Sequence, residues 1–140
     1  MLEALPEFTS KPEALLAACA FGYLAGSIPF GILIAKILGL GDLRKVGSGN
    51  IGATNVLRTG NKLAAFLTLL FDFSKGICAV LLVRQFFGED AVQVSAFSSL
   101  MGHCFPIWLR FKGGKGVATF LGVTIALFFI IGIICCFVWL

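Results

Sequence analysis

The sequence contains few charged residues. Lys, Arg, Asp and Glu together make up 13% of its 140 residues, whereas soluble domains contain about 25%. Hydrophobic residues make up 59% of the chain, and its mean hydropathy is +1.00. This composition argues against a soluble globular domain. It also argues against intrinsic disorder and a nucleic-acid-binding domain, which need low hydrophobicity or clustered surface charge. An integral membrane protein remains.

The residues of a metal site are missing as well. The only histidine is His103, which has Cys104 beside it, and the five cysteines include no CxxC pair. Zinc sites need several cysteines or histidines at short, defined spacings. A basic N-terminal region is also absent, because residues 1–13 contain three glutamates and one lysine. We therefore predict no metal site and no signal peptide.

Long apolar stretches dominate what is present. A membrane-spanning helix takes about 20 residues, and four stretches reach that length. They predict an all-α polytopic transmembrane bundle that forms one domain over the whole chain. The predicted spans are 14–35, 63–83, 91–109 and 116–140.

Polar residues interrupt two of these spans. Asp72 and Lys75 lie three residues apart and share a helix face, either as an ion pair that orients the helix or with Lys75 reaching toward an anion. Lys75 lies about 20 Å along the helix from Lys62, which argues against direct contact with a substrate. The span 91–109 contains three serines and His103, so we expect the other helices to shield it from lipid.

The placement of Lys and Arg predicts the orientation. Loops 36–62 and 110–115 would lie on one side and contain seven cations, leaving out Lys36 at the helix end. The N-terminal tail and turn 84–90 would lie on the other side and contain two. The positive-inside rule then places the first pair of loops in the cytoplasm and the N-terminus outside.

Small residues recur in the first span. They allow helices to approach closely in lipid, so we predict a packing face there. Pro29 should kink the helix. The small residues are Gly22, Gly26, Ser27 and Gly31.

Both predicted cytoplasmic loops combine glycines with cations and small polar residues. The first contains GSGNIGATN at 47–55, and the second reads FKGGKG at 111–116. Glycine lets backbone N–H groups approach an anion, and cations add charge. The loops therefore suggest one site for phosphate groups. The alternative is two flexible turns whose cations only reflect membrane orientation. His103 would lie about 10 Å below this face, as a general base, a phosphate ligand or a histidine bonded to a neighbouring helix.

These motifs together resemble a known family. GSIPFG at 26–31, GSGNIGATNVLR at 47–58, Asp72 with Lys75-Gly76, GHCFP at 102–106 and FKGGKGVAT at 111–119 resemble the bacterial acyl-phosphate:glycerol-3-phosphate acyltransferases. The resemblance implies a bacterial inner-membrane enzyme with seven spanning helices, of which about four are present here. It also implies that no metal or cofactor is needed.

The resemblance implies transfer of a fatty acyl group from acyl phosphate to the 1-hydroxyl of glycerol 3-phosphate. The products are lysophosphatidic acid and phosphate, the first step of phospholipid synthesis. The implied catalytic residues are His103, Ser48 and Lys115. The implied phosphate- and substrate-binding residues are Gly47, Ser48, Gly49, Asn50, Thr54, Asn55, Arg58, Lys112, Gly113, Gly114 and Lys115. The general base is His103 or a substrate phosphate.

The family also has a third motif in its C-terminal part, which this chain lacks. We therefore expect a truncated chain that is inactive by itself. The competing hypothesis is a small channel or transporter for phosphate-like anions, which should show polar residues continuing across the bilayer. A purely structural membrane subunit is a third possibility, but it leaves the two glycine loops unexplained.

Overall fold

The computed structural model describes residues 9–139, and this part of the chain is helical without strands. The predicted all-α class is confirmed. Residues 1–8, most of the tail predicted to lie outside the cell, are not among the described residues. The elements are α1 (Pro12–Gly26), α2 (Phe30–Ile37), the 3-10 turn η1 (Leu43–Lys45), α3 (Ala53–Leu57), α4 (Lys62–Arg84), α5 (Glu89–Cys104), the 3-10 turn η2 (Ile107–Leu109), α6 (Val117–Leu127) and α7 (Phe129–Trp139).

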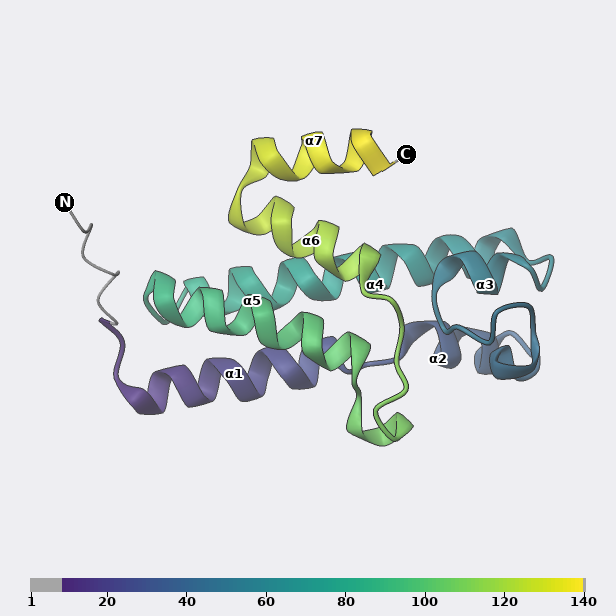
Figure 1. The fold of residues 1–140 in the computed structure, drawn as a ribbon, viewed down its shortest axis with the longest axis horizontal. Helices are drawn as coiled ribbons and strands as arrows, with labels where there is room; N and C mark the ends of the chain where they lie inside the picture. Colours follow the sequence, from purple (N-terminus) through teal and green to yellow (C-terminus); the bar gives the residue numbers. More distant parts are fainter. Residues whose placement is uncertain (1–8, 140) are drawn as a thin grey trace.

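Three long helices form the body of the molecule. Helices α1, α4 and α5 lie side by side, α6 packs across α4, and α7 folds back against α6 (Figure 1). Two segments, Pro12–Ile37 and Lys62–Arg84, are long and apolar enough to cross a membrane. The loops before and after α3, and the one between α5 and α6, lie toward the same end of the bundle (Figure 1).

Helix α4 matches the predicted span 63–83 to within one residue at each end. Its start is set by Asn61, whose side-chain oxygen accepts the N–H of Ala64 at 2.9 Å. Such a cap binds one of the N–H groups that the first turn of a helix leaves without a partner. A local signal in the sequence therefore sets this boundary.

Helix α5 is shorter than the predicted span 91–109. It ends at Cys104, and Phe105 has φ −131° and ψ 56°. Pro106 explains the early end, because the residue before a proline is sterically excluded from the α-helical region. The segment beyond the helix continues as η2.

The first predicted span is broken, as Pro29 indicated. Helix α1 ends at Gly26 and α2 begins at Phe30. The break leaves carbonyl groups without helical partners, and side chains from elsewhere bind them. Lys75 Nζ donates to the Ile28 carbonyl at 2.8 Å, and Trp108 Nε1 donates to the Ser27 carbonyl at 3.1 Å.

The prediction of one continuous helix over 116–140 is wrong, because Phe128 leaves the helical conformation with φ −139° and ψ 87°. Helices α6 and α7 have 11 residues each, or about 16 Å of rise. Arg84 Nη1 accounts for part of the break by donating to the freed Ala126 carbonyl at 2.7 Å. Gly132 accounts for the reversal, because a side chain there would overlap the Ile125 backbone.

The packing face predicted on the first span is confirmed. A Cβ at Gly22 would collide with the backbone of Ser95, and a Cβ at Gly26 with that of Ser99. The serines of α5 are correspondingly buried between helices, and Ser95 donates to the Ala79 carbonyl of α4 at 2.8 Å. The prediction that the polar residues of this segment are shielded by other helices is therefore confirmed for these serines.

We expect Gly26→Ala to loosen the contact between α1 and α5. The added methyl group meets a rigid backbone, and overpacking of this kind costs about 1–3 kcal/mol. Thermal unfolding in detergent should show a lower midpoint. Ala20→Ser, which adds one atom at an exposed position of α1, is the control. Equal midpoints for the two variants would contradict the close contact.

Candidate active site

The two glycine-rich loops meet, as the sequence predicted. Arg44 joins them, because its Nη1 donates to the Gly49 carbonyl at 3.3 Å and its Nη2 donates to the Lys112 carbonyl. A single guanidinium group therefore holds a carbonyl of each loop. Its planar arrangement of donors suits this bridging role.

Asn55 organises the first loop from within. Its side chain is 2% exposed, and its Nδ2 donates to the carbonyls of Leu43 at 3.0 Å and Asn50 at 2.7 Å. Its Oδ1 accepts the N–H of Ser48 at 3.1 Å. With its amide group bound on both sides, Asn55 shapes the loop that presents the other polar side chains.

The second loop is built around His103. The N–H of Gly113 donates to the Cys104 carbonyl and that of Gly114 to the His103 carbonyl, each at 3.0 Å. A Cβ at Gly114 would collide with His103 Nε2. The structure therefore uses these N–H groups to fold the loop against the end of α5, rather than to bind an anion as the sequence suggested.

A cleft of about 200 Å³ opens between the two loops and the helices below them. Its walls come from the loop before α3, α3 and the residue after it, the middle of α4, the end of α5, the start of α6 and the end of α7. The lining residues are Ser48, Asn50, Gly52, Ala53, Thr54, Asn55, Arg58, Leu69, Asp72, His103, Lys115, Gly116, Val117, Ala118 and Trp139.

The cleft collects most of the predicted side chains and leaves out a few residues. Gly47 and Gly49 have left-handed φ values of 50° and 67° and shape the first loop beside the cleft. Lys112 is exposed and meets Arg44 through its carbonyl. With Gly113 and Gly114, these residues are not in the lining. Arg58 and Lys115 are the cations that line it.

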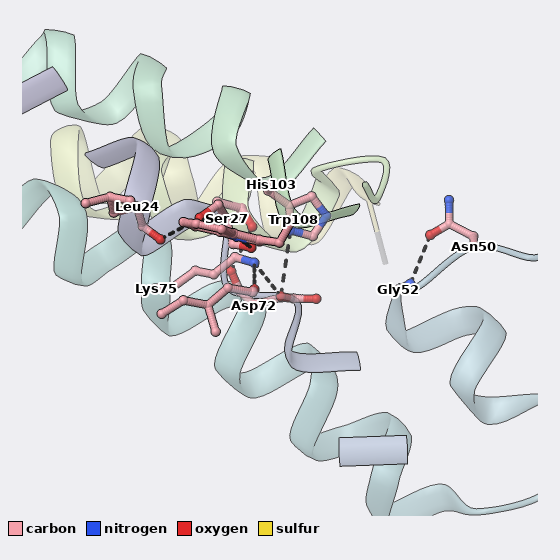
Figure 2. Close-up of polar contacts among 10 residues, drawn as sticks. Leu24, Ser27, Asn50, Gly52, Asp72, Lys75, His103 and Trp108 are labelled. Carbon is pink, nitrogen blue, oxygen red and sulfur yellow. Dashed lines mark hydrogen bonds and ion pairs between the residues drawn. The ribbon is translucent and has the colours of Figure 1, made fainter. Parts of the chain in front are cut away.

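A buried charge network lies at the bottom of the cleft. Lys75 Nζ is 2.7 Å from Asp72 Oδ1, and the same carboxylate oxygen is 3.7 Å from His103 Nδ1. All three residues are at most 5% exposed. Figure 2 shows Asp72 joined by dashed lines to both Lys75 and His103. The carboxylate thus lies between the ammonium group and the imidazole ring.

Glycines bring α4 and α6 together at this level. A Cβ at Gly76 would collide with the Thr119 carbonyl, and one at Gly122 with the Phe73 carbonyl. Thr119 Oγ1 donates to the backbone carbonyl of Asp72 at 2.9 Å. The start of α6, with Gly116 and its neighbours, is therefore held beside the Asp72 turn of α4.

Comparison with known proteins identifies the family. A family model described as glycerol-3-phosphate acyltransferase matches residues 16–140. This chain belongs to the glycerol-3-phosphate acyltransferase family. The family resemblance recognised in the sequence motifs is thereby confirmed.

Curated relatives of the chain support the same family. A glycerol-3-phosphate acyltransferase of Cereibacter sphaeroides is 61% identical over 136 residues, which cover 97% of this chain and 68% of the relative. One of Jannaschia sp. is 65% identical over 135 residues, covering 96% of this chain and 66% of the relative. The chain thus spans about two thirds of the length of these acyltransferases.

Solved structures of the family share the fold. The crystal structure of PlsY (YgiH), an integral membrane glycerol 3-phosphate acyltransferase, in its glycerol 3-phosphate form has a TM-score of 0.83 and 44% sequence identity. The match covers 90% of this chain and 64% of that one. The lysophosphatidic acid form has a TM-score of 0.78 at 39% identity, with 90% and 63% covered. The comparisons give no support to a channel or transporter.

Several residues of this acyltransferase family member matter to the cleft in ways that the sequence did not predict. Arg44 was counted only as a loop cation, yet it joins the two loops. Asp72 was predicted only as the ion-pair partner of Lys75, yet it lines the cleft. Tyr23 and Trp108 anchor the segment after α5 to α1, since the Tyr23 hydroxyl donates to the Phe105 carbonyl at 2.8 Å. No short sequence motif predicts contacts between residues that lie so far apart in the chain.

An apolar groove adjoins the polar cleft of the acyltransferase. It has a volume of about 230 Å³ and shares Leu69, Ala118 and Trp139 with the cleft. The other residues that line it, also apolar or weakly polar, are Phe66, Leu70, Phe73, Leu121 and Cys136. A polar cleft that opens into an apolar groove suits an amphipathic molecule.

Gly114→Ala should displace the His103 ring, because the new methyl group occupies the position of Nε2. In a chimera of this chain followed by the remaining third of the Jannaschia relative, we expect acyltransferase activity to fall about 10²-fold or more, as for other displacements of about 1 Å in an active site. The measurement is lysophosphatidic acid formation.

Gly39→Asn is the matched control. No heavy atom lies within 4 Å of a Cβ at Gly39, and asparagine tolerates its left-handed φ of 66°. Activity of Gly114→Ala equal to that of this control would show that the ring position is unimportant.

Proposed function

We propose that this chain forms the substrate cleft of an enzyme that transfers a fatty acyl group from acyl phosphate to the 1-hydroxyl of glycerol 3-phosphate. The products are lysophosphatidic acid and inorganic phosphate. The observation that supports this most directly is the meeting of the family motifs around one cleft. Ser48 and Arg58 come from the first motif, His103 from the end of α5 and Lys115 from the second loop. The curated relatives have names that specify the same acceptor.

Phosphate binding is the first task of the cleft. Both proposed substrates have a phosphate group, and Arg58 and Lys115 provide positive charge at the cleft wall. Ser48 and Thr54 add hydroxyl groups beside them. Charge-assisted hydrogen bonds from such groups are about twice as strong as neutral ones. We assign Arg58 and Lys115 to substrate phosphates, and Ser48, Asn50 and Thr54 to substrate oxygens.

The acyl chain has an apolar site close at hand. We place it in the groove beside Phe66, Leu70 and Phe73, which adjoins the polar cleft at Leu69. Burial of each methylene group stabilises binding by about 0.8 kcal/mol. The reactive carbonyl group then lies where groove and cleft meet, next to the proposed phosphate ligands.

The chemistry needs little beyond positioning. Acyl phosphate is a mixed anhydride, so phosphate leaves readily once the glycerol oxygen attacks the carbonyl carbon. Holding the two substrates together supplies much of the acceleration. Lys115 stabilises the developing oxyanion and the leaving phosphate through its positive charge. Among the lining side chains, His103 has a ring nitrogen that can accept a proton when the imidazole is neutral, and it is the proposed acceptor of the hydroxyl proton.

We further propose that the protein is a multi-pass protein of the bacterial inner membrane, with this cleft facing the cytoplasm and the N-terminus outside. The seven-to-two distribution of Lys and Arg supports this orientation. Of the predicted spans, 14–35 and 63–83 fall within the long apolar segments Pro12–Ile37 and Lys62–Arg84.

The experiment that tests the function measures phosphate release from palmitoyl phosphate, with and without glycerol 3-phosphate. It compares this chain, the intact Jannaschia relative, and a chimera of this chain followed by the remaining third of that relative. Release by the chimera that depends on glycerol 3-phosphate supports the proposal. An inactive chimera, when the intact relative is active and both proteins fold, would contradict the proposed function. Activity of this chain alone would correct the expectation that it is inactive.

Arg58→Ala and Lys115→Ala in the active chimera should each lower kcat/KM for glycerol 3-phosphate roughly 10- to 100-fold. The reason is the loss of a hydrogen bond to a charged group, worth about 1.5–3 kcal/mol. Lys45→Ala is the matched control, because Lys45 is an exposed cation of the same loop outside the cleft lining. Losses as large in Lys45→Ala would point to overall charge rather than to specific phosphate ligands.

A further inference from the structure

Two buried polar atoms face each other below the cleft. Asp72 Oδ1 and His103 Nδ1 are 3.7 Å apart. Apart from the ion pair of Oδ1 with Lys75, neither atom has a hydrogen-bond partner among the described residues. Buried polar groups in proteins nearly always have such a partner. A hydrogen bond between these two atoms needs them to approach by only about 0.7 Å. Each atom is therefore the natural partner of the other.

The chemistry of Asp72 decides which of the two atoms donates. Its Oδ1 lies 2.7 Å from the Lys75 ammonium group, and a carboxylate paired with an ammonium group only accepts hydrogen bonds. The imidazole nitrogen that faces it must then be the donor. The Lys75 charge next to the pair disfavours a second positive charge on the ring. One proton, on Nδ1, satisfies both conditions.

The carboxylate is held in place from its other side. Lys75 Nζ also donates to the Ile28 carbonyl at 2.8 Å, at the break between α1 and α2. The ammonium group is thus fixed to the backbone of one helix while it pairs with the carboxylate of another. Asp72 therefore has a fixed partner that keeps its carboxylate directed at the ring (Figure 2).

The other ring nitrogen lies toward the second loop. Nε2 is the first atom that a Cβ at Gly114 would meet, and His103 lines the cleft. The ring can lie this close to the second loop because Gly114 has no side chain. With its proton on Nδ1, the ring has an unshared electron pair on Nε2 that a substrate hydroxyl group can use.

We propose that Asp72 is a positioning residue that holds His103 in the tautomer protonated at Nδ1, with the lone pair of Nε2 directed to the cleft. The use of this tautomer rests on the proposed function. As the glycerol oxygen bonds to the acyl carbonyl carbon, Nε2 takes the hydroxyl proton. The bond from that carbon to the phosphate oxygen then breaks, and phosphate leaves with the electron pair and receives the proton from Nε2.

The test uses the single histidine of the chain. The protein is labelled with 15N-histidine, purified through a tag without histidine and reconstituted in lipid nanodiscs at neutral pH. The 15N chemical shifts of one ring then report which nitrogen has the proton. We expect Nδ1 to be protonated in the unaltered chain. Protonation at Nε2 alone, or at both nitrogens, would overturn the proposal, and this measurement needs no substitution.

Two variants separate positioning from packing. Asp72→Asn keeps the shape of the side chain, but its amide N–H group can donate to Nδ1, so we expect the ring proton to move to Nε2. Ser95→Ala removes a bond of 2.8 Å between the same helices α5 and α4 without facing the ring, and should leave the tautomer unchanged. An unchanged tautomer in folded Asp72→Asn would overturn the proposal, as would an equal shift in Ser95→Ala.

Activity provides an independent measurement. The active chimera is used only for kinetics. In it, Asp72→Asn should lower kcat roughly 10²-fold, the lower end of what a general base contributes. KM for glycerol 3-phosphate should change far less, and Ser95→Ala should keep both constants. A loss confined to KM would overturn the positioning role. If the unaltered chimera is inactive while His103 of this chain is protonated at Nδ1, the proposed function fails and the tautomer assignment stands.

Discussion

Lys75 introduces one positive charge into the middle of an apolar helix, and three parts of the molecule are arranged around it. Desolvation of an ammonium group costs several kcal/mol unless charged and hydrogen-bonding partners compensate. Asp72 provides the charge. The Ile28 carbonyl provides the hydrogen bond, and it is free to do so because Pro29 breaks the first helix. The ion pair and the helix break therefore depend on each other, and the cleft lies directly above both.

Close helix contacts bring the cleft walls to this buried pair. In lipid, helices gain little from the hydrophobic effect and associate through close packing of small residues. Gly22 and Gly26 bring α1 against α5, and Gly76 and Gly122 bring α4 against α6. The result is that the end of α5 and the start of α6, which hold the second loop between them, arrive beside Asp72. The same contacts that stabilise the bundle thus position His103.

Local signals in the sequence predicted part of this fold well. The bounds of α4 follow from its apolar length and the Asn61 cap, and the break of the first span follows from Pro29. The hairpin of α6 and α7 could not be predicted in this way, because residues 116–140 are uniformly apolar. Its turn depends on Arg84 binding the Ala126 carbonyl, 42 residues away along the chain. Hydropathy has no information about such a contact.

The site was predictable on the two loops, on α3 and at the end of α5, but not in the middle of α4. Glycine, cations and small polar residues identified Ser48, Arg58 and Lys115, because these residue types bind phosphate wherever they gather. Lys75 was set aside as a substrate ligand because depth was measured along α4 from Lys62, as if the protein surface were flat, and Asp72 was predicted only as its ion-pair partner. The cleft descends to the level of Asp72. At that level water is scarce and electrostatic interactions are strong, so a carboxylate there controls a neighbouring imidazole more effectively than it could at the surface.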